Sequence, residues 1–115
     1  MTYYNQDRAA AGVAPLVWDG CLAGVALNVA QTMANSETMA HGNGLNQDFA
    51  CHPSATGENL AEYPGPSENL AWCNSQWMAS SGHKANIMNA AFMHVALAWA
   101  VGANGEGYYA VELSG

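Results

Sequence analysis

The stretch that decides the fold is FMHVALAWAVGANGEGYYAVELSG, residues 92–115. From Met93 to Val101, large apolar residues alternate with histidine and alanines, and this period of two is typical of a β-strand. The glycine-rich segment at 102–107 predicts a turn, and YYAVEL at 108–113 predicts the returning strand. Both faces of the first strand are apolar, so helices are expected to cover the sheet on both sides.

A helix is predicted between Asp19 and about Asn35, where apolar residues recur at helical spacing. Asp19 can cap its first turn, because a carboxylate accepts main-chain N–H groups that lack a partner within the helix. A shorter helix is predicted from Thr2 to Ala11, and Gly12 ends it.

The middle of the chain has a weaker pattern. Residues 41–66 are rich in Gly, Asn, Pro and Ser, which predicts a loop with one short extended piece at 58–63. Ser67 can cap a third helix that ends at Gly82, and residues 83–88 predict one or two further helical turns. The sequence therefore indicates one α+β domain over residues 1–115, with three or four helices on an antiparallel sheet.

The charge balance excludes several classes of partner. The chain has two Lys or Arg residues against nine Asp or Glu residues, and its formal net charge is −7. Such a chain cannot supply the phosphate contacts of a nucleic-acid-binding protein. No apolar run reaches the roughly 20 residues of a membrane-spanning helix. The polar start MTYYNQDRAA shows no signal peptide, although a start at Met1 is compatible with a removed leader.

Three cysteines, Cys21, Cys51 and Cys73, lack the C-x-x-C spacing of a structural zinc site. Two interpretations are open. All three thiols are buried as small apolar groups, or Cys51 and Cys73 form a disulfide, because they stand on either side of the segment GEN. In the second case Cys21 is expected to be buried and free on the second helix.

Five segments in order resemble the CAP superfamily. They are NQDRAAAGVAPLVWDGCL with the alanine-rich helix after it, MAHGN, GENLA, WMASSGHKANIM and the closing hairpin. The family covers cysteine-rich secretory proteins, antigen 5 and pathogenesis-related 1 proteins, together with short bacterial relatives. The resemblance implies a three-layer α–β–α sandwich, with an antiparallel sheet flanked by helices, in a secreted protein.

The resemblance also implies a cleft with two histidines and two acidic residues. Carried over to this sequence, these residues are His41 in MAHGN, Glu58 in GEN and His83 in SSGH. The second acidic position, three residues after Trp77, holds Ser80. The implied cleft is therefore formed by His41, Glu58, Ser80 and His83.

This set of residues has a definite chemistry. Neutral imidazoles bind divalent metals, and a nearby carboxylate can ligate the metal or orient an imidazole. We interpret His41 and His83 as candidate ligands of a divalent metal such as zinc. A structural role, in which both histidines hydrogen-bond Glu58 and main-chain groups, is the alternative.

Two functions are compatible with such a cleft. The first is a secreted, monomeric module that binds a small ligand, a lipid or a cell-wall component. The second is a hydrolase of peptide or cell-wall bonds, with His41, Glu58 and His83 as its catalytic residues. Ser80 stands where a second carboxylate would be needed, and this favours the binding module.

The remaining histidines and tryptophans are expected to be structural. His52 precedes Pro53 in a polar loop, which predicts a solvated side chain, and His94 is expected to cap a strand edge. Core positions are expected for Trp18, Trp77 and Trp99, and partial exposure for Trp72.

Overall fold

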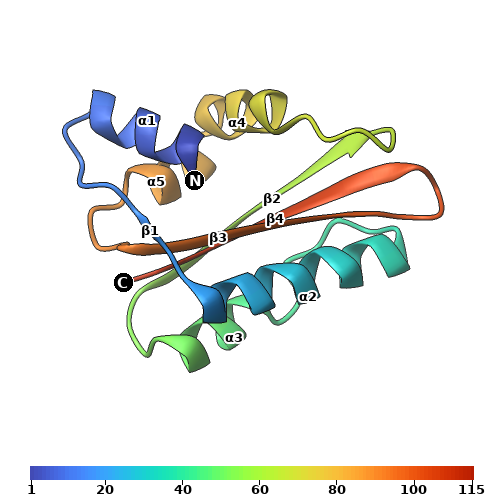
Figure 1. The fold of residues 1–115 in the computed structure, drawn as a ribbon, viewed down its shortest axis with the longest axis horizontal. Helices are drawn as coiled ribbons and strands as arrows, with labels where there is room; N and C mark the ends of the chain where they lie inside the picture. The colour runs from blue at the N-terminus through green and yellow to red at the C-terminus, as the bar shows by residue number, and fades with distance from the viewer.

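The structure is a computed structural model that describes all residues from 1 to 115 (Figure 1). Helices α1, α4 and α5 cover one face of the sheet, and helices α2 and α3 cover the other, so the predicted three-layer sandwich is confirmed. In chain order the elements are α1 (Thr2–Ala10), β1 (Val17–Trp18), α2 (Gly20–Ser36), α3 (Gly44–Cys51), β2 (Thr56–Pro64), α4 (Leu70–Ala79), α5 (Ser81–Met88), β3 (His94–Val101) and β4 (Glu106–Ser114). No helix combines the length and the apolar character needed to cross a membrane.

The sheet has the strand order β1-β3-β4-β2. The three long strands are antiparallel to their neighbours, as predicted, whereas β1 pairs in parallel with the start of β3. This short pairing arises because the extended connector before α2 lies along β3, where Asp19 N donates to Val95 O at 3.0 Å. The sheet is therefore mixed, and β2 is one of its two edge strands.

Helix α2 forms for the reasons that its sequence indicates. The Asp19 side chain accepts a hydrogen bond from Leu22 N at 2.9 Å, which is the predicted N-cap. The predicted small face of β3 is also confirmed, because Ala96 packs against Leu22 and Ala26 of this helix. Alanines at that face let the helix lie close to the sheet.

Two local predictions were wrong in the middle of the chain. The predicted loop at 41–66 contains the eight-residue helix α3, and β2 is a nine-residue strand. The third helix begins at Leu70 rather than after Ser67, because Asn69 caps it by accepting from Trp72 N at 3.1 Å. The Tyr109 hydroxyl accepts from Asn69 N at 2.6 Å and so fixes the helix start over the sheet.

The predicted pairing of Cys51 with Cys73 was wrong. Cys21 and Cys51 form the disulfide, with their Cα atoms 5.8 Å apart, while Cys73 is free and buried. Cys21 on α2 and Cys51 on α3 lie on the same face of the sheet, whereas Cys73 on α4 belongs to the core of the opposite face. The bridge closes a 30-residue separation, for which the chain-entropy model gives a stabilisation of roughly 3–4 kcal/mol.

The tryptophans divide between core and surface. Trp77 is buried, and its indole N–H donates to Leu60 O at 2.8 Å. Trp99 is half-buried against the same core, and Trp72 is partly exposed as expected. Trp18 was expected in the core but is 53% exposed, because it lies on the two-residue edge strand β1.

Candidate functional site

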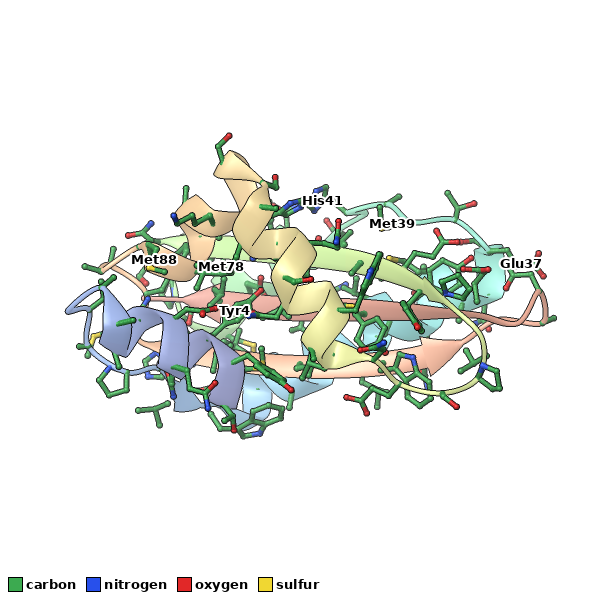
Figure 2. The ribbon with its side chains drawn as sticks, turned by 90° about the horizontal axis from the view of Figure 1, so that it is seen from above. Tyr4, Glu37, Met39, His41, Met78 and Met88 are labelled. Carbon is green, nitrogen blue, oxygen red and sulfur yellow. A yellow bond between two sulfur atoms is a disulfide. The ribbon has the colours of Figure 1, made fainter.

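The candidate site lies where the connector between α2 and α3 passes the edge strand β2. Helix α2 ends at Ser36, and its C-cap residue Glu37 adopts a left-handed backbone conformation with φ of 53°. Figure 2 shows Glu37, Met39 and His41 in succession along one side of the molecule, toward the end of α4. The connector therefore brings His41 to the side of the sheet that β2 forms.

His41 and Glu58 are in direct contact. The distance from His41 Nδ1 to Glu58 Oε1 is 2.8 Å, and the Glu58 side chain is fully buried while that of His41 is 60% exposed. A carboxylate only accepts hydrogen bonds, so Nδ1 carries the proton in this contact. His41 Nε2 then has no protein hydrogen-bond partner. The predicted contact between Glu58 and one of the two histidines is thus present.

Two further acids, which were not predicted from the sequence, lie beside Glu58. Glu112 stands directly opposite Glu58 in the β2–β4 ladder, and Asp48 comes from α3; all three side chains are buried. Burial, together with hydrogen bonds to Glu58 and Asp48, raises the pKa of Glu112 to about 12. Burial also raises the pKa of Asp48 to about 7. Like charges directly opposite in a ladder are destabilising, so Glu112 holds a proton at neutral pH.

Gly44 is required where α3 begins. A Cβ atom at this position would overlap Glu58 Oε2 and would lie 3.0 Å from Glu112 Oε1. Only glycine therefore lets the first turn of α3 lie on these carboxyl groups. The positive end of the helix dipole is then close to Glu58, which suits its charge.

Helix α5 is attached to β2 beside Glu58. The Asn59 side chain donates to His83 O at 3.2 Å, and the Asn86 side chain donates to Glu58 O at 3.3 Å. Alternation along β2 sends Glu58 toward α3 and Asn59 toward α5. The segment GEN thus fixes an acid on one face of the sheet and the α4–α5 junction on the other.

Ser80 and His83 line a groove with a volume of about 270 Å³, which we call the α4 groove. Its lining also contains Met39, Leu60, Ala61, Glu62, Trp72, Gln76 and Trp77. His41 lines a separate, smaller pocket of about 110 Å³ between α2, the connector and α3. Met39, two residues before His41, borders the α4 groove, so the connector separates the two hollows. That the His41 and His83 rings face each other stays a prediction.

A group of three candidate metal ligands lies elsewhere in the molecule. It contains Asp19, His52 and His94, whose ligand atoms all lie within 4.8 Å of one another. His52 was expected to be solvated, but its Nε2 is 2.7 Å from Asp19 Oδ2. The expectation failed because His52 directly follows Cys51, and the disulfide holds this loop against the start of α2.

Signals for the missed residues differ in strength. Glu112 is an acid within the apolar strand YYAVEL, which is a visible signal for a buried carboxyl group. Asp48 has no such context, because its helix was not predicted. The approach of His94 to His52 depends on the tertiary fold and had no signal in the sequence.

Comparison with solved structures supports the fold. An outer surface protein of Borrelia burgdorferi superposes with a TM-score of 0.81 at 19% identity, covering 97% of this chain and 86% of that one. An extracellular protein of Bacillus anthracis that contains an SCP domain gives 0.73 at 23% identity, covering 96% of this chain and 37% of that one. NaASP2, solved with Zn²⁺, gives 0.62 at 11% identity, covering 88% and 60%.

No curated protein sequence matches the chain significantly. The model of the CAP family, described as the cysteine-rich secretory protein family, matches residues 1–113. This match covers nearly the whole chain and agrees with the sandwich. The chain therefore belongs to the CAP family.

Proposed function

We propose that this protein is an extracellular binding module, in which His41 and His83 hold a divalent metal such as zinc beside the α4 groove. An extracellular location is supported by the family and by two structural relatives, one described as an outer surface protein and one as extracellular. The zinc in the NaASP2 structure supports the choice of metal.

The observation that carries the proposal is the contact between His41 and Glu58. A buried carboxylate that accepts the Nδ1 proton of a histidine fixes the ring and raises the basicity of Nε2. Because the His41 side chain is 60% exposed, a metal can reach it from solvent.

His83 is the second proposed ligand, and waters complete the shell. His83 lies on α5. The Asn59 side chain holds this helix to β2 by donating to His83 O, and the Asn86 side chain of the helix donates to Glu58 O. Ser80 replaces the acid expected at the fourth position, so the metal has few protein ligands. We therefore expect modest zinc affinity.

The α4 groove is the proposed ligand site. Met39, Leu60, Ala61 and Trp72 give it an apolar wall, and Trp72 is 41% exposed beside the Tyr63 ring at 5.2 Å. Apolar walls with a few polar groups are typical of sites for small ligands. The groove therefore suits an apolar ligand, such as a lipid chain, with a polar end near His83 or Glu62.

The state of Ser80 argues against one route to hydrolysis, attack by a serine nucleophile. The Ser80 hydroxyl makes no hydrogen bond to a histidine or carboxylate, and Ser80 occupies the N-cap position of α5. A nucleophilic serine needs a base within hydrogen-bonding distance. The protein is therefore not proposed to act through a serine nucleophile.

Calorimetric zinc titration tests the metal site. We expect His41→Ala and His83→Ala to weaken binding at this site at least tenfold each, and Glu58→Gln to weaken it about tenfold by loss of the orienting charge. Gln31→Ala, on the exposed face of α2, is the control and is expected to bind as the wild type does. Unchanged zinc binding in the His41→Ala, His83→Ala double variant would exclude the proposed site.

A further inference from the structure

A second cluster of metal-binding groups lies at the N-terminal end of α2. Asp19 is the N-cap of α2, His52 follows the last residue of α3, and His94 is the first residue of β3. Their ligand atoms lie within 4.8 Å of one another, and none of the three residues is fully buried. Three separate elements thus bring two imidazoles and one carboxylate to one place.

The hydrogen bonds of this cluster leave suitable atoms for a metal. Asp19 Oδ1 accepts from Leu22 N, while Oδ2 is 2.7 Å from His52 Nε2. His94 Nδ1 is 3.2 Å from Gly115 O; a main-chain oxygen only accepts, so Nδ1 donates and Nε2 is left without a protein partner. An N–H that donates to a main-chain oxygen is the usual support of a metal-binding imidazole.

We infer that Asp19, His52 and His94 form a second divalent-metal site, distinct from the one proposed at His41 and His83. Two histidines and one carboxylate are a common ligand set for zinc and other first-row divalent ions, with water in the open positions. The side chains of His52 and Asp19 are 31% and 16% exposed, so an ion can enter from solvent.

Binding requires a small rearrangement of His52, whose Nε2 donates to Asp19 Oδ2 and must first give its proton to solvent or to Nδ1. Its ring is stacked on that of His94, with centroids 4.5 Å apart and planes 8° apart. Parallel rings cannot both direct an in-plane lone pair at one ion, so one ring must turn. His94 is held by β3 and Gly115, whereas His52 lies beyond the end of α3 and is the ring that turns. Two ligands of a tetrahedral zinc at about 2.1 Å from the metal lie roughly 3.4 Å apart, so the 2.7 Å contact of His52 with Asp19 opens only slightly.

The disulfide holds the backbone of two ligands in place. Cys51 directly precedes His52, and Cys21 comes two residues after Asp19, so the Cys21–Cys51 bridge joins the two ligand-bearing segments. The net charge of −7 also favours the approach of a cation. The site is thus preorganised by a covalent link, which the site at His41 lacks.

Zinc stoichiometry in matched double variants tests this inference separately from the proposed function. Wild-type protein is expected to bind two zinc ions, and His41→Ala with His83→Ala to retain one. His52→Ala with His94→Ala is also expected to retain one, and the quadruple variant none. Circular dichroism checks that each variant is folded.

Two results would overturn the inference: no zinc bound by the folded His41→Ala, His83→Ala variant, or no zinc lost on adding His52→Ala and His94→Ala to it. If the wild type binds a single zinc ion, and only the His52→Ala, His94→Ala substitutions abolish its binding, the His41 site is refuted and this one stands.

An NMR titration gives an independent readout on the wild type. The ring protons of His52 and His94 are expected to lose their mutual ring-current shift when zinc is added, and unchanged ring signals at saturation would contradict the inference.

Discussion

The two faces of the sheet bury charge in different ways. On the face covered by α1, α4 and α5, the buried Arg8 guanidinium donates to four main-chain oxygens, those of Ala14, Ile87, Asn89 and Phe92, at 2.7–3.0 Å. On the face covered by α2 and α3, the buried acids are Asp48, Glu58 and Glu112. Five of their carboxyl oxygens receive no hydrogen bond from any other protein group, apart from protons that the acids share among themselves. Each nitrogen of the cation donates to a main-chain oxygen, whereas most oxygens of the acids have no such partner.

This difference separates a structural charge from a functional one. A buried group whose hydrogen bonds are complete joins segments and does nothing else. Arg8 joins α1 to the segment between α5 and β3 in this way. A buried acid that lacks donors must share protons or contact an exposed base, and Glu58 contacts His41. The acidic face is therefore expected to support the metal site proposed at His41.

The largest effect is expected at Arg8. Arg8→Ala leaves four main-chain oxygens without their donor, so we expect a loss of about 3–5 kcal/mol in the free energy of unfolding, measured by urea denaturation. Arg8→Lys, which keeps the charge but has fewer donors, should lose less. A loss below about 1 kcal/mol in Arg8→Ala would mean that water replaces the guanidinium, and the comparison of the two faces would fail.

The pH dependence of stability tests the acidic face. Because the pKa of Glu112 is raised from 4.5 to about 12, the folded state binds a proton that the unfolded state releases, and stability falls as pH rises above about 4.5. Glu112→Gln needs no proton uptake, so it should be near neutral at pH 4 and stabilising by roughly 2–3 kcal/mol at pH 7. Urea midpoints of both proteins across this range measure the difference. Parallel pH profiles would show that Glu112 is ionised when folded.

A smaller effect is expected where α2 approaches the sheet. Ala98 packs against the helix on the small face of β3. Ala98→Leu should overpack this contact and destabilise the protein by about 1–3 kcal/mol. Ala103→Leu, in the exposed turn, is the control for added apolar bulk. If both variants unfold at the wild-type midpoint, the small face has room that the packing does not indicate.

Local pattern predicted the parts of the fold that depend on neighbouring residues. The β3–β4 hairpin followed from alternation and a glycine-rich turn, and α2 followed from its apolar stripe and the Asp19 cap. Helix α3 and the Cys21–Cys51 pairing were missed, because both depend on how the 37–55 segment packs under the sheet.

The sequence predicted only part of the candidate site. His41, Glu58 and His83 came from the family resemblance, since two histidines 42 positions apart have no local reason to be close. Glu112 meets Glu58 through strand register, and His94 meets His52 through the path of the chain after the disulfide. Register and long-range packing are set by the whole fold and not by any short segment.

The smallest change in stability is expected at His41, and it decides between a structural and a metal-binding histidine. His41→Asn keeps an N–H donor near the position of Nδ1, so the hydrogen bond to buried Glu58 can persist, but it removes Nε2. We therefore expect the free energy of unfolding to change by less than about 0.5 kcal/mol, since the His41 side chain is 60% exposed. Zinc affinity at this site should nevertheless fall at least tenfold, because the lost nitrogen is the ligand.

The comparison variant is His41→Ala, which leaves the Glu58 oxygen without a donor. Its free energy of unfolding should fall by about 1–3 kcal/mol, and zinc binding at this site should be lost as well. If His41→Asn binds zinc as tightly as wild type, His41 only ties the connector to β2, and the proposed metal site is refuted.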